Sequence, residues 1–342
     1  MTNNSYSLYL NQSLNLERLG GLISKNEIFN LKGFLGSSIS FYISGLQKRF
    51  SIPFIIVFNS KQDALYFLND IELLYPSKKI FYYPEISKEP YLDANSNNYN
   101  LLQRTELLEH LNFSKADNSI IVTYAKAVSE NQINKEDLKK ISIKLKVSQE
   151  ISFDELNEKL FDLGFRREDF VIEPGEFAVR GGILDIFPYS SQTPFRIEFF
   201  GDEISRIRSF DIDTQRSDEN HESIKIISNI RVSNKSKGVG NIFNILSKDT
   251  FVFVQNLEIF YSEIQKNISK ANLNFEKILD KENFIHPERL FANPSSIKNE
   301  IKNYKIIEFE NPKSNKSFKI NILPQPSFNK SFDFLIDDLR SK

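Results

Sequence analysis

The segment Gly33 to Ser40, GFLGSSIS, resembles the template G-x-x-x-x-G-K-[ST] of phosphate-binding loops. Gly33 and Ser40 fit the two ends, but Ser38 replaces the second glycine and Ile39 replaces the lysine. That lysine places a cation on the β- and γ-phosphates, whereas isoleucine has neither a charge nor a donor. We therefore expect no nucleotide cofactor here. The favoured interpretation is a Gly/Ser turn that caps a helix, and residual phosphate binding is the alternative.

A second signal is the distribution of the basic residues. The stretch Arg166 to Arg216 contains seven arginines and no lysine, although lysines outnumber arginines 31 to six in the rest of the chain. Arginine supplies planar, multidentate donors that lysine lacks, so this stretch is a candidate binding surface. The competing explanation is internal ion pairing, which we expect for at least half of these arginines. Its carboxylates would be Glu173, Glu176, Asp185, Glu198, Asp202 and Glu203.

Strand alternation separates the two faces of the segment Phe195 to Phe200. The core face would carry Phe195, Ile197 and Phe199. The opposite face would carry Arg196, Glu198 and Phe200. An arginine beside an exposed aromatic side chain is typical of protein-protein hot spots. A second layer of structure covering that face is the alternative.

Composition narrows the class of protein. The 342 residues exceed one ordinary core and include no cysteine, which excludes disulfides and thiolate sites. His110, His221 and His286 lack metal-ligand spacing, so we expect no metal. A formal charge of −1 does not favour general nucleic-acid binding. With neither a leader-like start nor an apolar run long enough to span a bilayer, we expect a cytoplasmic protein that has no membrane partner.

The pattern of apolar residues predicts an α/β fold. Four strands are expected near residues 28–31, 53–58, 79–83 and 119–124, with helices over 61–75 and 98–112. After residue 140, hairpin signals at Gly181-Gly182 and Gly201-Asp202 indicate an antiparallel α+β domain. The Ser/Asn/Lys/Gly stretch 233–241 reads as a linker, and strands near 250–254 and 305–309 follow. We expect domains over residues 1–140, 141–232 and 233–342.

Three segments carry a resemblance to a known family. EPGEFAVRGGILDIFP (173–188), RIEFFGDEISRIRSFDIDTQRS (196–217) and PQPSFNKSF (324–332) are similar to the UvrB-homology region of bacterial transcription-repair coupling factors (Mfd). The resemblance runs from about Leu31 to the end. It implies a parallel-sheet domain in two parts, with a degenerate P-loop and no ATPase, flanking an inserted antiparallel α+β domain that binds UvrA. Arg180, Arg196 and Phe200 match the UvrA-contacting positions.

The resemblance implies a non-catalytic adaptor that recruits UvrA to stalled transcription sites in nucleotide excision repair. The family continues into an RNA-polymerase-binding domain and an ATP-dependent DNA translocase, which this sequence does not contain. Without them, we expect the UvrA-binding surface to be uncovered and to compete with UvrB. Replacing Arg180 or Arg196 should weaken UvrA binding and leave the melting temperature nearly unchanged. The alternatives are a UvrB-like ATPase that binds damaged DNA and a plain DNA-binding module.

Overall fold

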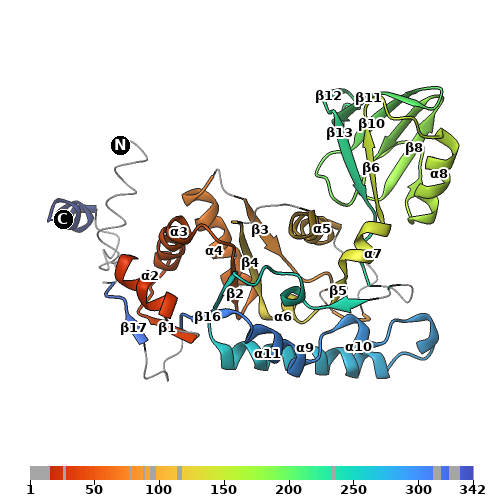
Figure 1. Cartoon of the computed structure of the whole chain (residues 1–342). Coiled ribbons are helices and arrows are strands. Elements are labelled where there is room, and N and C mark those ends of the chain that lie inside the picture. The colour runs from red at the N-terminus through yellow and green to blue at the C-terminus, as the bar shows by residue number, and fades with distance from the viewer. Residues whose placement is uncertain are drawn as a thin grey trace.

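The structure is a computed structural model. It describes residues 16–25, 28–76, 79–87, 89–92, 98–113, 118–232, 236, 238–310, 317–322 and 332–341. The chain forms two units, one built on a parallel sheet and one on a smaller mixed sheet, joined at α7 (Lys135–Lys140) and the strands around it (Figure 1). Within these residues, no helix is long and apolar enough to cross a membrane.

The first unit contains a seven-stranded sheet in the order β17-β1-β16-β15-β2-β4-β3, and every neighbouring pair is parallel. Its strands are β1 (Ile28–Lys32), β2 (Phe54–Phe58), β3 (Ile80–Tyr83), β4 (Ile120–Tyr124), β15 (Phe251–Val254), β16 (Lys305–Glu308) and β17 (Ser317–Lys319). Segments from both ends of the chain thus build one sheet. The predicted α/β class, with a parallel-sheet domain in two parts around an insertion, is confirmed.

Helices cover both faces of this sheet. In Figure 1, α3 and α4 lie on one side, and α9 and α11 lie on the other. The helices of this unit are α2 (Leu16–Lys25), α3 (Ser38–Phe50), α4 (Lys61–Leu74), α5 (Asn98–Phe113), α6 (Ala125–Val128), α9 (Leu257–Glu276), α10 (Pro287–Leu290) and α11 (Pro294–Ile301). Strands buried on both faces read as continuous apolar runs, which is why FIIVF and IIVTY show no alternation.

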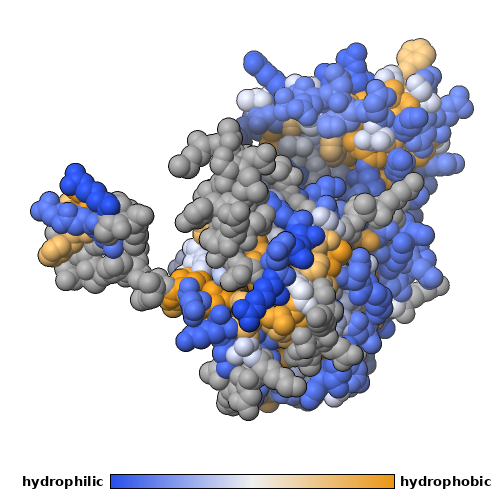
Figure 2. Space-filling view, turned by 60° about the vertical axis from the view of Figure 1, so that its left-hand side comes forward, coloured by the Kyte–Doolittle hydropathy of each residue, from blue (hydrophilic) through white to orange (hydrophobic). Residues whose placement is uncertain are grey.

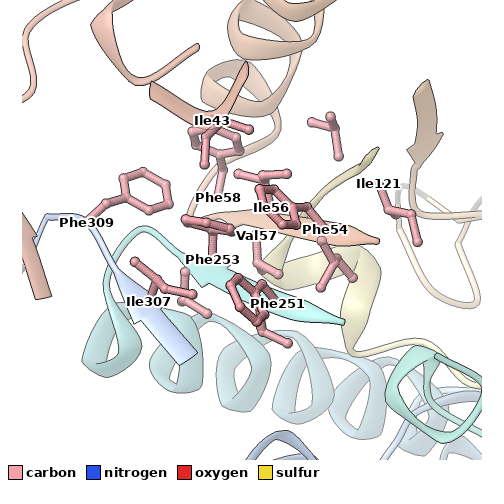
Figure 3. Packing of buried hydrophobic residues seen from close by; sticks show 14 of the residues in the cluster. Ile43, Phe54, Ile56, Val57, Phe58, Ile121, Phe251, Phe253, Ile307 and Phe309 are labelled. Atoms are coloured by element: carbon pink, nitrogen blue, oxygen red, sulfur yellow. The ribbon is translucent and has the colours of Figure 1, made fainter. Parts of the chain in front are cut away.

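Phenylalanines account for much of this core. The rings of Phe54 and Phe251 stack at 5.6 Å between centroids, and Phe253 lies 5.0 Å from Phe54 (Figure 3). Because β15 pairs with β2 in register, these rings come together from segments almost 200 residues apart in sequence. Offset aromatic contacts of this kind stabilise the core beyond the burial of area alone.

The second unit contains a six-stranded sheet in the order β12-β11-β10-β9-β8-β7. Its strands are β7 (Arg166–Arg167), β8 (Glu176–Arg180), β9 (Ile183–Ile186), β10 (Phe195–Phe200), β11 (Glu203–Phe210) and β12 (Ser217–Asn220). Only the pair β7 and β8 is parallel; the other pairs are antiparallel. The predicted hairpins at Gly181-Gly182 and Gly201-Asp202 join β8 to β9 and β10 to β11.

One face of this sheet is the core face. Helix α8 (Phe153–Asp162) packs on it through Leu156 and Leu160, together with the ribbon formed by β6 (Ser142–Lys146) and β13 (Ser223–Ile227). The opposite face, which we call the outer face, has no helix of the described residues on it. A small apolar island, Val171, Ala178, Phe187 and Phe210, lies apart from the main cluster.

Two later segments were singled out in the sequence, 233–241 as a linker and 324–332 as part of the family resemblance. The predicted linker 233–241 is partly a strand: β14 (Val239–Gly240) pairs with β5 (Gln132–Ile133), because the chain re-enters the first unit before residue 241. The segment 324–332 lies outside the described residues except for Phe332, which begins the helix α12 (Phe332–Ser341). The division at residues 140 and 232 into three domains stays a prediction.

A buried ion pair ties α5 to the carboxyl end of β4. The Arg104 guanidinium, 1% exposed, donates to the Glu130 carboxylate over 2.7 Å and to the carbonyl of Ala127 over 3.0 Å. Glu130 also accepts the backbone N–H of Ile86, and Arg104 lies 4.0 Å from the ring centre of Tyr83. Burial raises the pKa of Glu130, while Arg104 and the backbone N–H groups act in the opposite direction.

Replacing Arg104 with Met should lower the free energy of unfolding by about 3 kcal/mol, because it leaves the buried Glu130 carboxylate without its cation. Adding Glu130→Gln should restore part of the loss. Lys266→Met is the matched control, since its partner Glu263 and Lys266 itself are both exposed and such pairs contribute below about 1 kcal/mol. Urea unfolding would measure all four proteins, and a loss for Arg104→Met no larger than that of the control would contradict the assignment.

Candidate functional site

The loop that resembles a P-loop is built for packing. Gly33 has φ of 95°, and a Cβ added there would lie 2.2 Å from the carbonyl oxygen of Ile320, so only glycine fits. Ser38 begins α3, and its hydroxyl accepts the backbone N–H of Leu35 over 2.9 Å. A turn precedes the helix, as expected, but Ser37 at the N-cap position makes no side-chain capping hydrogen bond. The first glycine of the template therefore has a structural reason that involves no phosphate.

The positions that would serve a nucleotide are occupied otherwise. The Ile39 side chain is buried in the main apolar cluster, and the Ser40 hydroxyl, fully buried, donates to the Asp70 carboxylate over 3.4 Å. A cavity of about 350 Å³ beside the loop has three carboxylates in its lining, Asp63, Asp70 and Glu310. No lysine or arginine of the described residues lines it. This cavity would repel a triphosphate.

The outer face of the second sheet is organised in two rows by strand register. The first row runs Ala178, Asp185, Arg196, Arg208, and the second runs Arg180, Ile183, Glu198, Arg206. Phe200 continues β10 on the same face, next to the turn at Gly201. The structure thus places the three predicted residues, Arg180, Arg196 and Phe200, on one face. The core face carries Phe195, Ile197 and Phe199, as alternation predicted.

Arg196 is held by an internal ion pair. Its Nε and Nη2 atoms each donate to one oxygen of the Asp185 carboxylate over 2.8 Å, and Nη1 donates to the carbonyl of Gln215 over 3.2 Å. The guanidinium also lies 4.8 Å from the ring centre of Phe210. Its side chain is 16% exposed and that of Asp185 is 3% exposed. Hydrogen bonding to Asp185 raises the pKa of Arg196 further.

Phe200 has the opposite environment. It is 83% exposed, although it ends a strand whose other aromatic side chains face the core. Gly201, with φ of 62°, supplies the left-handed residue that lets the chain turn directly after it. Figure 2 shows the visible surface of the second unit as mainly hydrophilic with separate apolar patches. No second layer covers Phe200 among the described residues.

Arg180 is exposed at the edge of the outer face. Its guanidinium donates to the carbonyl of Asp169 and stacks 4.4 Å from the ring centre of Phe170, itself 56% exposed. A guanidinium stacked on an aromatic ring keeps most of its donors free for another molecule. Arg180 and Phe170 thus form an exposed aromatic and cationic pair at the opposite end of the face from β12.

The structure adds three residues that sequence reasoning missed. Ile183 lies in the same row as Arg180 and is partly exposed, Phe170 supports Arg180, and Arg206 is exposed in that row. The guanidinium of Arg206 makes no ion pair or hydrogen bond among the described residues. The strand alternation that placed Arg196 and Phe200 on one face could also have placed Ile183 and Arg206 on that face, on neighbouring strands. Nothing in the sequence indicated Phe170, because a loop brings it under Arg180.

Among the described residues, internal ion pairing accounts for three of the seven arginines of this stretch, fewer than the half that was expected. Arg166 pairs with Glu176 at 3.1 Å, Arg196 pairs with Asp185, and Arg208 pairs with Glu198. The two rows of the outer face hold four arginines and two carboxylates. Because both carboxylates are already paired, the exposed cations are Arg180 and Arg206. The second row therefore combines positive charge with the partly exposed Ile183, whereas Glu150, Asp202 and Glu203 line the hollow beside Phe200 and make that end of the face acidic.

The described residues hold no cluster of candidate metal ligands. No three His, Asp or Glu side chains within them come close enough together to hold a metal ion. The feature that combines exposure, charge and aromatic side chains is the outer face.

Comparison with known proteins assigns this region to a family. Residues 143–231 match the model of the UvrB interaction domain. The chain is 30% identical over 259 residues to the transcription-repair-coupling factor of Bacillus subtilis, an alignment that covers 72% of this chain and 21% of that protein. It is 34% identical over 131 residues to the factor of Escherichia coli (38% and 11%), and 49% identical over 84 residues to that of Staphylococcus haemolyticus (25% and 7%).

The chain thus spans about a fifth of the length of the Bacillus subtilis relative. Its inserted sheet lies within the matched residues 143–231, and its longest alignment also takes in a large part of the parallel-sheet unit. Residues 143–231 are accordingly a UvrB interaction domain, and over much of its length the chain is homologous to the N-terminal part of the transcription-repair-coupling factors.

Proposed function

We propose that this chain is a non-catalytic adaptor whose outer face binds UvrA and recruits it to stalled transcription sites in nucleotide excision repair. The observation that carries the proposal is the exposure of Phe200, at 83%, on a strand within the UvrB interaction domain. An aromatic side chain held in water is costly unless a partner covers it, and such residues dominate binding energy at interfaces. The parallel-sheet unit would act as a scaffold.

Each predicted residue has its own part in this proposal. Phe200 would be the desolvated anchor, and Arg180 would donate charge-assisted hydrogen bonds to acidic groups of UvrA. Arg196 is already committed to Asp185, so it would act mainly by keeping the face in shape, with its remaining donors at the rim of the contact. Arg206 joins Arg180 as an exposed cation. Acidic patches on the partner would complement this face.

The rival function, a UvrB-like ATPase, lacks support at the loop Gly33 to Ser40. The residue in the position of the phosphate-binding lysine, Ile39, is part of the core, and the adjoining cavity is acidic. Binding a nucleotide there would bring the charge of a triphosphate next to Asp70 and Glu310 with no cation to balance it. The adaptor therefore fits the loop better than the ATPase does.

The chain should not bind ATP. Titration with Mg-ATP by calorimetry is expected to give only the heat of dilution, because the loop has no lysine and the cavity has three carboxylates. A UvrB protein titrated under the same conditions is the positive control. A dissociation constant in the micromolar range for this chain would contradict the proposal.

Phe200→Ala and Arg180→Ala should each weaken UvrA binding by about 1 to 3 kcal/mol. Both side chains are exposed and outside the cores, so the melting temperature should not change. Leu279→Ala is the matched control, since Leu279 is fully exposed in the first unit, away from the outer face. Surface plasmon resonance with immobilised UvrA would measure the series, and equal affinities for Phe200→Ala and Leu279→Ala would refute the assignment of the face.

Arg196→Ala should behave differently and lower the free energy of unfolding by roughly 3 kcal/mol, because it leaves the buried Asp185 carboxylate unpaired. This replaces the sequence-based expectation of an unchanged melting temperature, which assumed an exposed Arg196. Arg196→Met with Asp185→Leu, which removes both charges, should recover stability. If Arg196→Ala had the same free energy of unfolding as the unchanged protein, the ion pair would not contribute to stability, and Arg196 would act in binding alone.

The chain should also compete with UvrB for UvrA, as expected if both proteins use matching surfaces. Adding it to a preformed UvrA-UvrB complex would displace UvrB, and the Phe200→Ala variant would displace it less well. Size-exclusion chromatography of the three-protein mixture would separate the outcomes. Coelution of all three in one complex at a single UvrA site would contradict competition.

A further inference from the structure

A cavity of about 470 Å³ opens in the first unit, away from the outer face. Its volume falls within the range of small-molecule sites, roughly 300 to 1,000 Å³. The wall is mainly apolar and comes from four parts of the chain: the segment after β3, residues 130–131, the segment after β13 that returns from the second unit, and residues 283–291. Its apolar residues include Ile86, Tyr91, Leu92, Phe284, Leu290 and Phe291.

One wall is held in an unfavourable backbone conformation. Tyr91 has φ of 68°, in the left-handed region that residues with a Cβ rarely adopt. Its hydroxyl donates to the carbonyl of Ile285 over 2.6 Å, and its ring packs on Phe275 and Phe284 at 5.2 and 6.3 Å between centroids. Such strain persists only where surrounding contacts enforce it, and it concentrates at ligand sites. The cavity therefore has a preformed, fixed aromatic wall.

The charged group without a partner at this cavity is Arg231. Its Nε and Nη2 atoms are buried and have no hydrogen-bond partner among the described residues, although the residue lines the cavity. The same two atoms of Arg196 grip both oxygens of Asp185. Burial lowers the pKa of the Arg231 guanidinium, although Tyr189 and Glu130 act in the opposite direction. A buried fork of this kind matches the geometry of a carboxylate.

The nearby carboxylate of Glu130 makes no hydrogen bond to these two atoms of Arg231. Glu130 also lines the cavity, but it is bound to Arg104 at 2.7 Å and to the N–H of Ile86 at 2.8 Å. With Arg104 and Glu130 balancing each other, Arg231 leaves one positive charge at the cavity. A ligand with a single negative charge would neutralise it, whereas a phosphate dianion would meet Glu130 and too few donors.

We propose that this cavity binds a small monocarboxylic acid with a compact apolar body. The carboxylate accepts from Nε and Nη2 of Arg231, which are buried in this structure and reach the ligand by rotation of the side chain, and the body packs on Tyr91, Phe284 and Leu290. This site is separate from the outer face and does not depend on UvrA binding. Since Arg231 belongs to the segment that returns from the second unit, the ligand contacts the connection between the two units.

The test compares acids with their neutral amides on the whole chain by calorimetry. The probes are benzoate, 3-phenylpropionate and indole-3-acetate, each paired with its primary amide, which has nearly the same shape but no charge. We expect at least one acid to bind about tenfold or more tightly than its amide, the usual weight of a charge-assisted bidentate bond. Equal affinity for acid and amide in every pair, or no binding of any acid, would overturn the proposal.

A variant then locates the site. Arg231→Gln should weaken the acid about tenfold or more and leave the amide unchanged, while Arg180→Gln on the outer face should change neither. Nuclear Overhauser contacts from the probe to the methyl groups of Leu290 supply a readout that needs no variant, should Arg231→Gln fail to fold. Unchanged acid binding by a folded Arg231→Gln protein, or contacts only at other methyl groups, would overturn the assignment.

Discussion

The order of strands in the parallel sheet constrains everything else in this chain. β2 pairs with β4 and β15, and β1 pairs with β16 and β17, so no bond joins the early strands directly across the centre. The centre forms only when residues 251–308 insert between them. The chain must therefore leave the first unit after β5, build the second unit, and return before the sheet can close. An interruption of the return would leave β2, β4 and β3 as a three-stranded sheet with an unpaired edge, and β1 with no partner strand.

The strand that leaves the first unit pairs with the strand that returns to it. β6 and β13 form an antiparallel ribbon, with Ile143 opposite Ile226 and Leu145 opposite Ile224, and the same ribbon packs under the six-stranded sheet. At its base an apolar cluster joins α5, α7 and residues 227–232, and Lys225 pairs with Glu109 at 3.5 Å. These contacts orient the second unit. Its outer face can thus be presented as a fixed surface rather than as a flexible appendage.

The outer face shows how one residue type serves two purposes. Arginine in the first row forms a bidentate pair with a buried carboxylate, whereas arginine in the second row stays exposed beside apolar side chains. Burial decides between the two: where the carboxylate is hidden, the guanidinium must remain with it, and removing either group is costly. The exposed arginines are not held by a buried carboxylate. A sequence that uses lysine elsewhere keeps arginine for both tasks because each needs a planar fork or a stacking surface.

Much of the architecture followed from patterns that act locally. Continuous apolar runs indicated strands buried on both faces, and β1 to β4, β15 and β16 lie within a residue or two of their predicted positions. Alternation sorted Phe195, Ile197 and Phe199 from Arg196 and Phe200, because successive side chains in a strand must point to opposite faces. The replacement of the phosphate-binding lysine by Ile39 could also be recognised in the sequence, because the P-loop template is defined by a short, fixed spacing.

What only the tertiary structure decided depends on contacts between distant segments. Such contacts make part of the predicted linker into the strand that pairs with β5, and they bring Asp185 to Arg196 and Phe170 to Arg180. The tertiary structure also left Nε and Nη2 of Arg231 without a hydrogen-bond partner among the described residues, beside a cavity that four separate segments line. By itself, the sequence determined which residues could be buried, turned or charged. Which of them meet is set by the closing of the sheet and by the burial that follows, and no local pattern encodes either.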